Sequence, residues 1–434
     1  MPDLISLTAA QRTRIQTGLT EGYFKAMSPG YLESETGRVD LENHVQGRYA
    51  AFVAHVLPWV RAAFDLAGKT VLEIGCGTGS ITAGLAQVAA HVEAFDIDEG
   101  SLASARARLD ALGLHNARMS CVEPGQLLGA ASRACAGGVD ACFLYAVLEH
   151  QTLPERLETL RTCWSLLSPG GVLVINETPN RLLPEDGHTS LMPFFQMLGD
   201  DVALRVAERS PRAEFSAAFA GANRDTPDAS LRLARWGRGV SHHEFELALG
   251  DLSGLCVADG YQVEMLRYRP LQPEEAALLA YVQRRALRVP AAFFRSFLDL
   301  VLRKPGEAAA GVLATPRFPD RVGGDQVEVT ANGGLRLGPG SHLDVRVPAG
   351  ATELILGTHS GPSQGVLLIT DTGGRPLYRE DLLASSTAPR YVKLSLLPTT
   401  LRVRIALEHP WLDRLRGMVG RVGVTLPIDY LAVR

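Results

Sequence analysis

The chain has 434 residues, of which 46% are hydrophobic and 21% are charged. This composition excludes a disordered, collagenous or coiled-coil protein, and the length exceeds that of one common catalytic domain, so we expect two domains. A net charge of −4 gives no sign of nucleic-acid binding. We see no secretory signal, no stretch long and apolar enough for a membrane span and no C-x-x-C pair, so we expect a cytoplasmic protein.

The pattern of apolar residues in the first half of the chain predicts a doubly wound, Rossmann-like sheet. Residues 1–66 carry helical patterns and are expected to form a cap. From Thr70 onward, five short apolar runs alternate with helical patterns: VLEIG, HVEAFDID, ARMSCVE, VDACFLYAV and VLVINE. Strands that alternate with helices of this length are typical of a parallel α/β sheet.

The pattern becomes less regular after residue 180. The segment 181–240 is too long for an ordinary connection, so we expect it to form a lid or a substrate wall. We then expect a helix over about 242–258, a strand at YQVEMLRYR, and two helices over 272–304 hinged at Pro290. The second of these helices, AAFFRSFLDLVLRK, could pack between domains or lie on a membrane surface.

The composition changes near residue 306. Short alternating runs, separated by turn signals such as NGG, GPG and TGG, continue almost to the end of the chain. This pattern predicts an antiparallel, jelly-roll-like β-sandwich over 306–434. The expected organisation is therefore a catalytic domain over 1–305, which includes the 1–66 cap and the 181–240 insertion, and a separate sandwich domain.

A glycine loop follows the first predicted strand in VLEIGCGTGS. Gly75, Gly77 and Gly79 would let the backbone turn tightly and approach a ligand, and the helix that follows offers free N–H groups to an anion. The dinucleotide-binding fingerprint would require glycine where Ser80 stands. Glu73 is an unexpected carboxylate in a buried strand, where a ligand's ammonium group or a water network could serve as its partner.

Acidic residues follow the next two predicted strands. Asp96 ends the second strand, where a carboxylate can bind ribose hydroxyls. Asp98 is expected in the turn or on the opposite face. Glu123 follows the third strand and could accept a hydrogen bond from an adenine amino group.

Taken together, these motifs resemble those of the class I S-adenosylmethionine-dependent methyltransferases, over about residues 40–180. VLEIGCGTGS is similar to the first motif of that family, FDID to its ribose-binding motif, and LYAVLEH with LLSPGGVLVINETPN to its fourth and fifth strands. The resemblance implies S-adenosylmethionine as cofactor. The cofactor-binding residues that we predict are Glu73, Gly75, Gly77, Gly79, Asp96, Ile97, Val122, Glu123 and Tyr145.

The resemblance also implies individual roles. Glu73 and the glycine loop would hold the methionine moiety, and Asp96 would hold the ribose. Val122 and Glu123 would flank the adenine, although the chain has VEP where the family often has Gly-Asp-Ala. Tyr145 and Ala146 would border the transferred methyl group through their backbone.

A sulfonium methyl group is a strong electrophile, so the protein must chiefly align the acceptor and remove its proton. The candidate catalytic residues are Glu149, His150, His188 and His243, and Asp186 could orient His188. Metal-binding relatives have a second glutamate three positions before the Glu-His pair, where this chain has Ala146. We therefore predict no metal, although the four candidates could still assemble a metal site.

The predicted acceptor is the hydroxyl group of a small molecule or a glycan. The Asn-Pro-Pro-Tyr type of motif that accompanies amino-group methylation is absent after the fourth strand, which favours oxygen, with nitrogen and carbon acceptors left open. Alternatively, the C-terminal domain defines the role through carbohydrate binding, domain contacts or homo-oligomer assembly, although its aromatic residues are few: Tyr378, Tyr391, Trp411 and Tyr430. The acidic pI opposes an RNA substrate.

Overall fold

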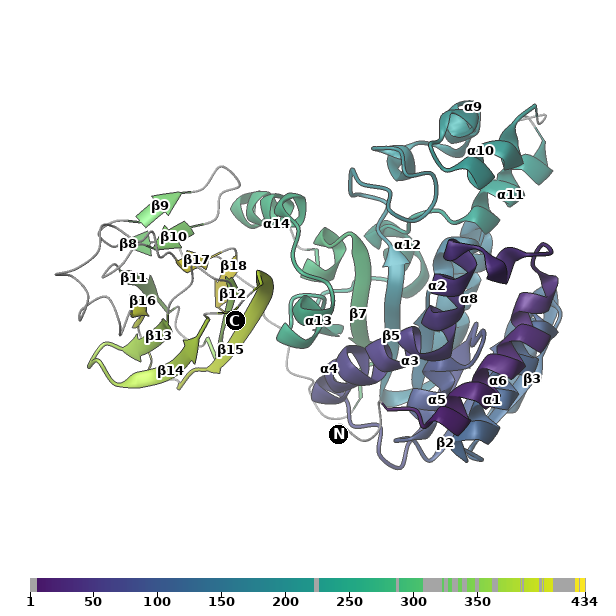
Figure 1. The fold of residues 1–434 in the computed structure, drawn as a ribbon, viewed down its shortest axis with the longest axis horizontal. Coiled ribbons are helices and arrows are strands. Elements are labelled where there is room, and N and C mark those ends of the chain that lie inside the picture. The colour runs from purple at the N-terminus through teal and green to yellow at the C-terminus, as the bar shows by residue number, and fades with distance from the viewer. Residues whose placement is uncertain are drawn as a thin grey trace. The chain divides into compact units, whose positions relative to one another are not determined.

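The chain folds into two compact units in a computed structural model (Figure 1). The first comprises Met1–Gly260 and Arg288–Leu313, and the second comprises Tyr261–Leu287 and Ala314–Arg434. The structure describes residues 6–221, 226–285, 289–306, 322–323, 327–329, 335–337, 342–347, 351–360, 366–382, 384, 386–397, 400, 402–408, 426–428 and 430–433. Within these residues, no helix is both long enough and apolar enough to cross a membrane.

The first unit is built on a seven-stranded sheet with the order β3-β2-β1-β4-β5-β7-β6. Strands β1 to β5 are mutually parallel, whereas β7 runs antiparallel to both β5 and β6. This arrangement confirms the predicted doubly wound sheet. The strands are β1 (Thr70–Ile74), β2 (His91–Asp96), β3 (Ala117–Cys121), β4 (Val139–Tyr145), β5 (Leu167–Pro179), β6 (Cys256–Ala258) and β7 (Phe297–Arg303).

Helices alternate with these strands, and their ends follow local chemistry. Asp98 accepts a hydrogen bond from the Ser101 N–H and begins one helix, which ends at Gly113 in the left-handed conformation. Thr152 and Glu155 form a capping box at the start of another. The helices are α5 (Ser80–Ala86), α6 (Glu99–Leu112), α7 (Leu127–Ala134), α8 (Leu153–Leu166) and α12 (His242–Leu249).

The N-terminal segment is helical, as its pattern predicted. Two π-helical turns, Asn43–Gly47 and Phe52–Val56, interrupt its helices. The buried Arg108 of α6 donates hydrogen bonds to the carbonyls of His44, Val45 and Thr78, which ties this segment to the glycine loop. The helices are α1 (Ala9–Glu21), α2 (Glu35–Glu42), α3 (Arg48–Ala51) and α4 (Leu57–Ala63).

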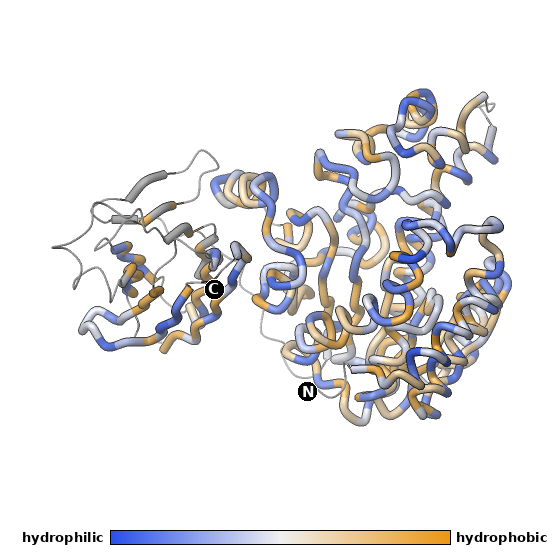
Figure 2. Tube along the Cα trace, viewed as in Figure 1, coloured by the Kyte–Doolittle hydropathy of each residue, from blue (hydrophilic) through white to orange (hydrophobic). Residues whose placement is uncertain are grey.

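The 181–240 insertion consists mainly of short helices with a small core of their own. Phe195, Phe215, Phe219 and Leu233 are buried in this core. Each helix carries both hydrophobic and hydrophilic residues, so one side can pack while the other faces water (Figure 2). The helices are α9 (Asp200–Val206), α10 (Ala213–Phe219) and α11 (Pro227–Trp236).

Three predicted elements after the insertion were wrong. The helix expected over 242–258 ends at Leu249 and is followed by β6. The run AAFFRSFLDLVLRK is a 3₁₀ turn at Ala291–Phe294 and then β7, not a helix. β7 is an interior strand, so nearly all of it is buried, and its short apolar run, interrupted by Asp299, does not by itself distinguish a strand from a helix. Its place in the sheet removes the membrane-surface interpretation.

The run YQVEMLRYR was expected to be a strand, but its centre forms helix α13 (Val263–Tyr268). Tyr261, Val263 and Met265 alternate as the residues of a strand would, and all three are buried. Leu266, which is also buried, breaks this alternation and completes a helical face.

The second unit is rich in antiparallel strands, as predicted. Its described strands form three sheets, with the orders β14-β13-β16-β11-β8, β15-β12-β18 and β17-β10-β9. The strands are β8 (Val322–Gly323), β9 (Val327–Val329), β10 (Leu335–Leu337), β11 (His342–Arg346), β12 (Glu353–Ser360), β13 (Val366–Asp371), β14 (Pro376–Asp381), β15 (Ala388–Ser395), β16 (Arg402–Glu408), β17 (Leu426–Ile428) and β18 (Tyr430–Val433). Trp411 lies outside the described residues.

Two helices that precede residue 305 belong to the second unit by their contacts. These are α13 and α14 (Pro273–Arg285). Arg267 donates to the Tyr391 carbonyl at 3.2 Å, and the Leu271 N–H donates to the Tyr391 hydroxyl at 2.9 Å. The compact unit therefore begins earlier than the predicted domain boundary, because an amphipathic helical pattern does not say which sheet the helix will cover.

Candidate functional site

The glycine loop lies between β1 and α5, and all three of its glycines have positive φ angles. A Cβ atom on Gly75 would lie 2.6 Å from Val147 Cγ2, and one on Gly79 would lie 2.7 Å from Ala105 Cβ. A Cβ atom on Gly77 would meet nothing within 4 Å. Gly75 and Gly79 are therefore required by close packing within the protein, whereas Gly77 borders open space.

A pocket of about 400 Å³ lies at the carboxyl ends of the central strands. Three of the residues predicted to bind the cofactor, Gly75, Asp96 and Ile97, line it. His150 and Arg235 also line it. A pocket of this size at this edge of an open α/β sheet is typical of a small-ligand site.

Backbone groups hold Asp96 in place at this pocket. Its Oδ2 accepts from the Gly77 N–H at 2.7 Å, and its Oδ1 accepts from the N–H groups of Ile97 at 2.7 Å and Asp98 at 3.0 Å. The neighbouring Asp98 instead caps α6. Of the two acidic residues, the one that lines the pocket is therefore Asp96.

Glu73 is buried beneath the loop, outside the pocket lining. Among the described residues its Oε2 has no hydrogen-bond partner, and the same holds for the hydroxyl of Ser80 at the start of α5. Burial raises the pKa of Glu73 to about 8. Such unsatisfied polar atoms need water or a ligand, so the residues present fit a cofactor with an amino-acid moiety.

The predicted adenine and methyl contacts are only partly at the pocket. Val122 packs against the core and Glu123 is exposed, while the next two residues, Pro124 and Gly125, line the pocket. Tyr145 is buried and is not among the lining residues. Ala146, which was predicted together with Tyr145, lines the pocket and has a φ of 53°.

Three of the four predicted catalytic residues come together. Glu149, His150 and His188 each offer a ligand atom, and these atoms all lie within 4.8 Å of one another. The two imidazole rings have centroids 5.4 Å apart. His243 is exposed on α12, where its ring contacts the ring of His242 at a tilt of 39°, so the structure does not bring it into this cluster.

Hydrogen bonds define the protonated nitrogen of each imidazole. His150 Nδ1 lies 2.9 Å from the Arg235 carbonyl, which can only accept, so Nδ1 carries the hydrogen. His188 Nδ1 lies 3.2 Å from the hydroxyl of Thr189, which already donates to the Gly237 carbonyl at 2.8 Å, so this Nδ1 must also donate. In the neutral state both rings therefore keep a lone pair on Nε2.

Burial favours the neutral forms in this cluster. It raises the pKa of Glu149 to about 8 and lowers the pKa of His188 to about 4. Burial also lowers the pKa of His150. At neutral pH both imidazoles are therefore uncharged, and each keeps a lone pair that can bind a cation or accept a hydrogen bond.

The turn that carries His188 depends on Asp186, but not in the predicted way. Asp186 accepts from the backbone N–H groups of His188, Thr189 and Ser190, at 3.1, 2.8 and 2.7 Å. Among the described residues, no hydrogen bond joins its carboxylate to the His188 ring. Asp186 therefore shapes the turn and does not orient the imidazole.

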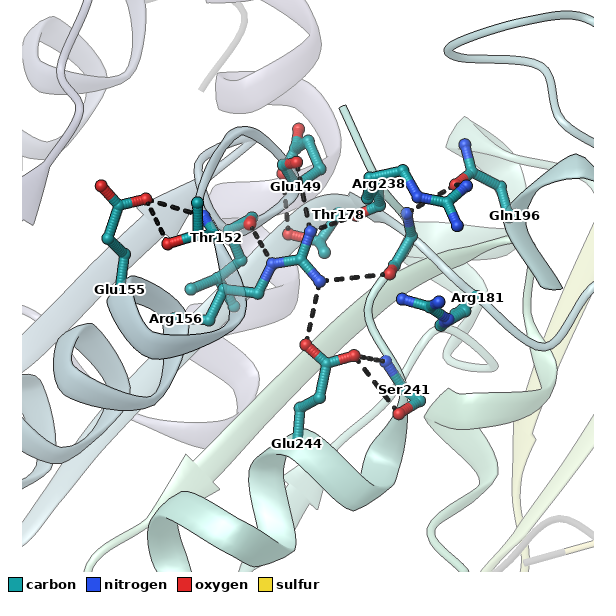
Figure 3. Close-up of polar contacts among 12 residues, drawn as sticks. Glu149, Thr152, Glu155, Arg156, Thr178, Arg181, Gln196, Arg238, Ser241 and Glu244 are labelled. Carbon is teal, nitrogen blue, oxygen red and sulfur yellow. Dashed lines mark hydrogen bonds and ion pairs between the residues drawn. The ribbon is translucent and has the colours of Figure 1, made fainter. Parts of the chain in front are cut away.

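Arg156, on α8, bonds the backbone of the 3₁₀ turn that carries Glu149 (Figure 3). Its guanidinium is buried, donates to the carbonyls of Leu148 at 2.7 Å and Glu149 at 3.3 Å, and pairs with Glu244 Oε2 at 2.9 Å. It also donates to the Arg238 carbonyl at 2.7 Å. Our sequence reasoning missed this residue, although an arginine four positions before Leu160 on an apolar helix face was an available signal.

Comparison with known proteins finds sequence similarity to methyltransferases. A family model described as "Methyltransferase domain" matches residues 72–173. A probable S-adenosylmethionine-dependent methyltransferase from Mycolicibacterium smegmatis is 33% identical over 33% of this chain and 51% of its own length. A ubiquinone biosynthesis O-methyltransferase from Pseudomonas paraeruginosa is 32% identical over 29% of this chain and 52% of its own.

The chain spans about half the length of these curated relatives. Among solved structures, magnesium protoporphyrin IX methyltransferase from Synechocystis PCC 6803 covers 41% of this chain and 80% of its own, with 22% identity and a TM-score of only 0.29. That score is too low to carry an argument. Residues 72–173 therefore match a methyltransferase domain, and S-adenosylmethionine-dependent methyltransferases are among the proteins to which the chain is similar.

Proposed function

We propose that this protein transfers the methyl group of S-adenosylmethionine to a hydroxyl oxygen of a small molecule or a glycan. The observation that carries the proposal is the position of His150, which lines the cofactor-sized pocket and also belongs to the Glu149–His150–His188 cluster. Groups that can handle a hydroxyl proton thus lie beside the expected methyl donor. The O-methyltransferase names of several relatives support oxygen as the acceptor atom.

The chain's residues would divide the work of the reaction. S-adenosylmethionine supplies an electrophilic methyl group, whose bond to sulfur breaks as the bond to oxygen forms, leaving S-adenosylhomocysteine. Glu73, with its unsatisfied oxygen, would hold the methionine ammonium, and Asp96 would hold the ribose. The neutral imidazoles of the cluster would accept a hydrogen bond from the acceptor hydroxyl and remove its proton.

The 181–240 insertion would form the wall of the acceptor site. It supplies His188 to the cluster, and the side chain of Arg235, from α11, lines the pocket. Arg235 is held by the carboxylate of Glu155 at 2.7 and 2.8 Å. We expect this segment to determine which acceptor enters.

A second role for the C-terminal unit has one specific observation behind it. A pocket of about 310 Å³ in that unit is lined by residues that include Tyr378, Tyr391, Glu380 and Arg390. Aromatic rings beside charged groups are compatible with the carbohydrate-binding alternative. Retention of the full chain on an immobilised glycan, lost in Tyr378→Ala, would support that role.

Calorimetric titration of the full chain with S-adenosylhomocysteine tests the proposed cofactor site. We expect binding by the wild type and a roughly 10- to 100-fold weaker affinity in Asp96→Ala, because a charged hydrogen bond contributes about 1.5–3 kcal/mol. Asp110→Ala, an exposed aspartate on α6, is the matched control. A wild type that fails to bind, or equal affinities in the two variants, would contradict the proposal.

The acceptor is tested separately, by incubating the enzyme and methyl-labelled S-adenosylmethionine with hydroxyl-bearing small molecules and glycans. We expect label in an ether that survives mild base. Label found only in amines, or in no compound, would count against the oxygen acceptor.

A further inference from the structure

We propose that Glu149, His150 and His188 form a binding site for a divalent transition-metal ion such as Zn²⁺ or Co²⁺. Our sequence analysis predicted no metal, because Ala146 replaces the glutamate that metal-binding relatives carry. The structure brings the remaining residues together in an arrangement of two imidazoles and one carboxylate.

The spacing of the three ligand atoms suits a single ion. Glu149 and His150 come from the 3₁₀ turn Leu148–His150, and His188 comes from the insertion. Their ligand atoms lie within 4.8 Å of one another. Bonds of about 2.0–2.2 Å to one ion place ligand atoms roughly 3–3.5 Å apart. Side-chain rotations that move each ligand atom by about 1 Å would therefore bring all three to bonding distance of the ion.

Both imidazoles are already in the tautomer that binds metals through Nε2. The Nδ1–H of His150 donates to the Arg235 carbonyl, and the Nδ1–H of His188 donates to Thr189. Partners of this kind fix the ring orientation of a ligating histidine and raise its basicity. Gln196 in turn donates to the Thr189 hydroxyl at 2.9 Å, which orients that acceptor.

The carboxylate of Glu149 supplies the second, independent observation. Its side chain is fully buried, and its Oε1 has no hydrogen-bond partner among the described residues. Oε2 has only a long contact of 3.4 Å with the Thr178 hydroxyl. The buried guanidinium of Arg156 bonds the Glu149 carbonyl and Glu244 (Figure 3). A cation between Glu149 and the two histidines would give the buried Oε1 the partner that it lacks.

The donor set indicates the class of ion. Imidazole nitrogens suit Zn²⁺, Co²⁺ and Fe²⁺, whereas Mg²⁺ and Ca²⁺ prefer oxygen ligands. Three protein ligands leave coordination positions open, as in catalytic rather than structural sites. Because His150 also lines the pocket, an acceptor hydroxyl there could take an open position, a role that rests on the proposed function.

The test is metal titration of the untagged full chain after removal of bound metal with a chelator. We expect one equivalent of Co²⁺ to bind, with visible absorption bands, and one equivalent of Zn²⁺ to displace it. Glu149→Gln and His188→Asn should weaken binding at least 100-fold. His115→Ala, which removes an exposed histidine, is the control and should bind as the wild type does.

Either of two results would overturn the site: no binding at one equivalent in the wild type, or unchanged affinity in both ligand variants. Circular dichroism confirms folding, and His150→Asn replaces any variant that fails to fold. Titration of the metal-free protein with S-adenosylhomocysteine separates the two proposals. Cofactor binding without metal binding defeats the metal site alone, and metal binding without cofactor binding defeats the proposed function alone.

Discussion

The ring of His188 lies directly against a glycine of the insertion. Gly237 has a φ of 113°, and a Cβ atom on it would lie 2.6 Å from His188 Cε1 and 2.7 Å from Nδ1. Both the backbone conformation and the close approach therefore require glycine. Gly237 is one of two glycines in the loop RWGRGV, and nothing in this motif indicated its role, because the histidine that it supports is distant in sequence.

We expect Gly237→Ala to lower the free energy of unfolding by about 1–3 kcal/mol, since alanine must adopt a strained backbone and push the imidazole aside. Urea unfolding followed by tryptophan fluorescence measures this, and the neighbouring Trp236 is a local reporter. Gly137→Ala is the control, because its Cβ would meet nothing within 4 Å and its φ is ordinary. Equal stabilities of the two variants would show that the contact between Gly237 and the His188 ring contributes little to stability.

At the scale of elements, prediction succeeded where the pattern is local. The first five strands and the glycine loop could be predicted because their apolar runs, glycines and helix caps lie next to one another in sequence. Prediction failed at β7 and α13. The structure of β7 depends on its pairing with β5 and β6, which are distant in sequence, and that of α13 on what it packs against. The site divides in the same way: Asp96 follows from its strand, whereas the choice between His188 and His243 depends on the path of the insertion.

The junction between α8 and the end of the insertion gives a test at this scale. Arg156→Met should lower the free energy of unfolding by about 3–5 kcal/mol, because it leaves Glu244 and several carbonyls buried without their partner. Urea unfolding measures the change. Arg161→Met is the matched control on the same helix, since Arg161 is exposed and makes one bond, to the Leu247 carbonyl. Similar losses in the two variants would argue against a special role for the junction.

At the scale of the whole molecule, the buried carboxyl group of Glu73 should make the stability of the first unit depend on pH. Burial raises the pKa of Glu73 to about 8, against an ordinary value of 4.5. A carboxyl group whose pKa is raised on folding stabilises the folded state fully below its unfolded pKa, and this contribution is lost as pH rises toward the folded value. The relevant window for Glu73 is therefore from about pH 4.5 to about pH 8.

Glu73→Gln replaces this acid with a neutral side chain of the same shape and should remove the dependence. The melting temperature of the wild type, relative to the variant, should fall by several degrees between pH 5 and pH 8, since about 1 kcal/mol shifts a melting temperature by 2–4 °C in domains of 150–250 residues. Thermal melts followed by tryptophan fluorescence report mainly on the first unit, which holds Trp59, Trp164 and Trp236. Parallel pH profiles for the two proteins would mean that Glu73 ionises in the folded chain at little cost, because water or a charged neighbour already satisfies it.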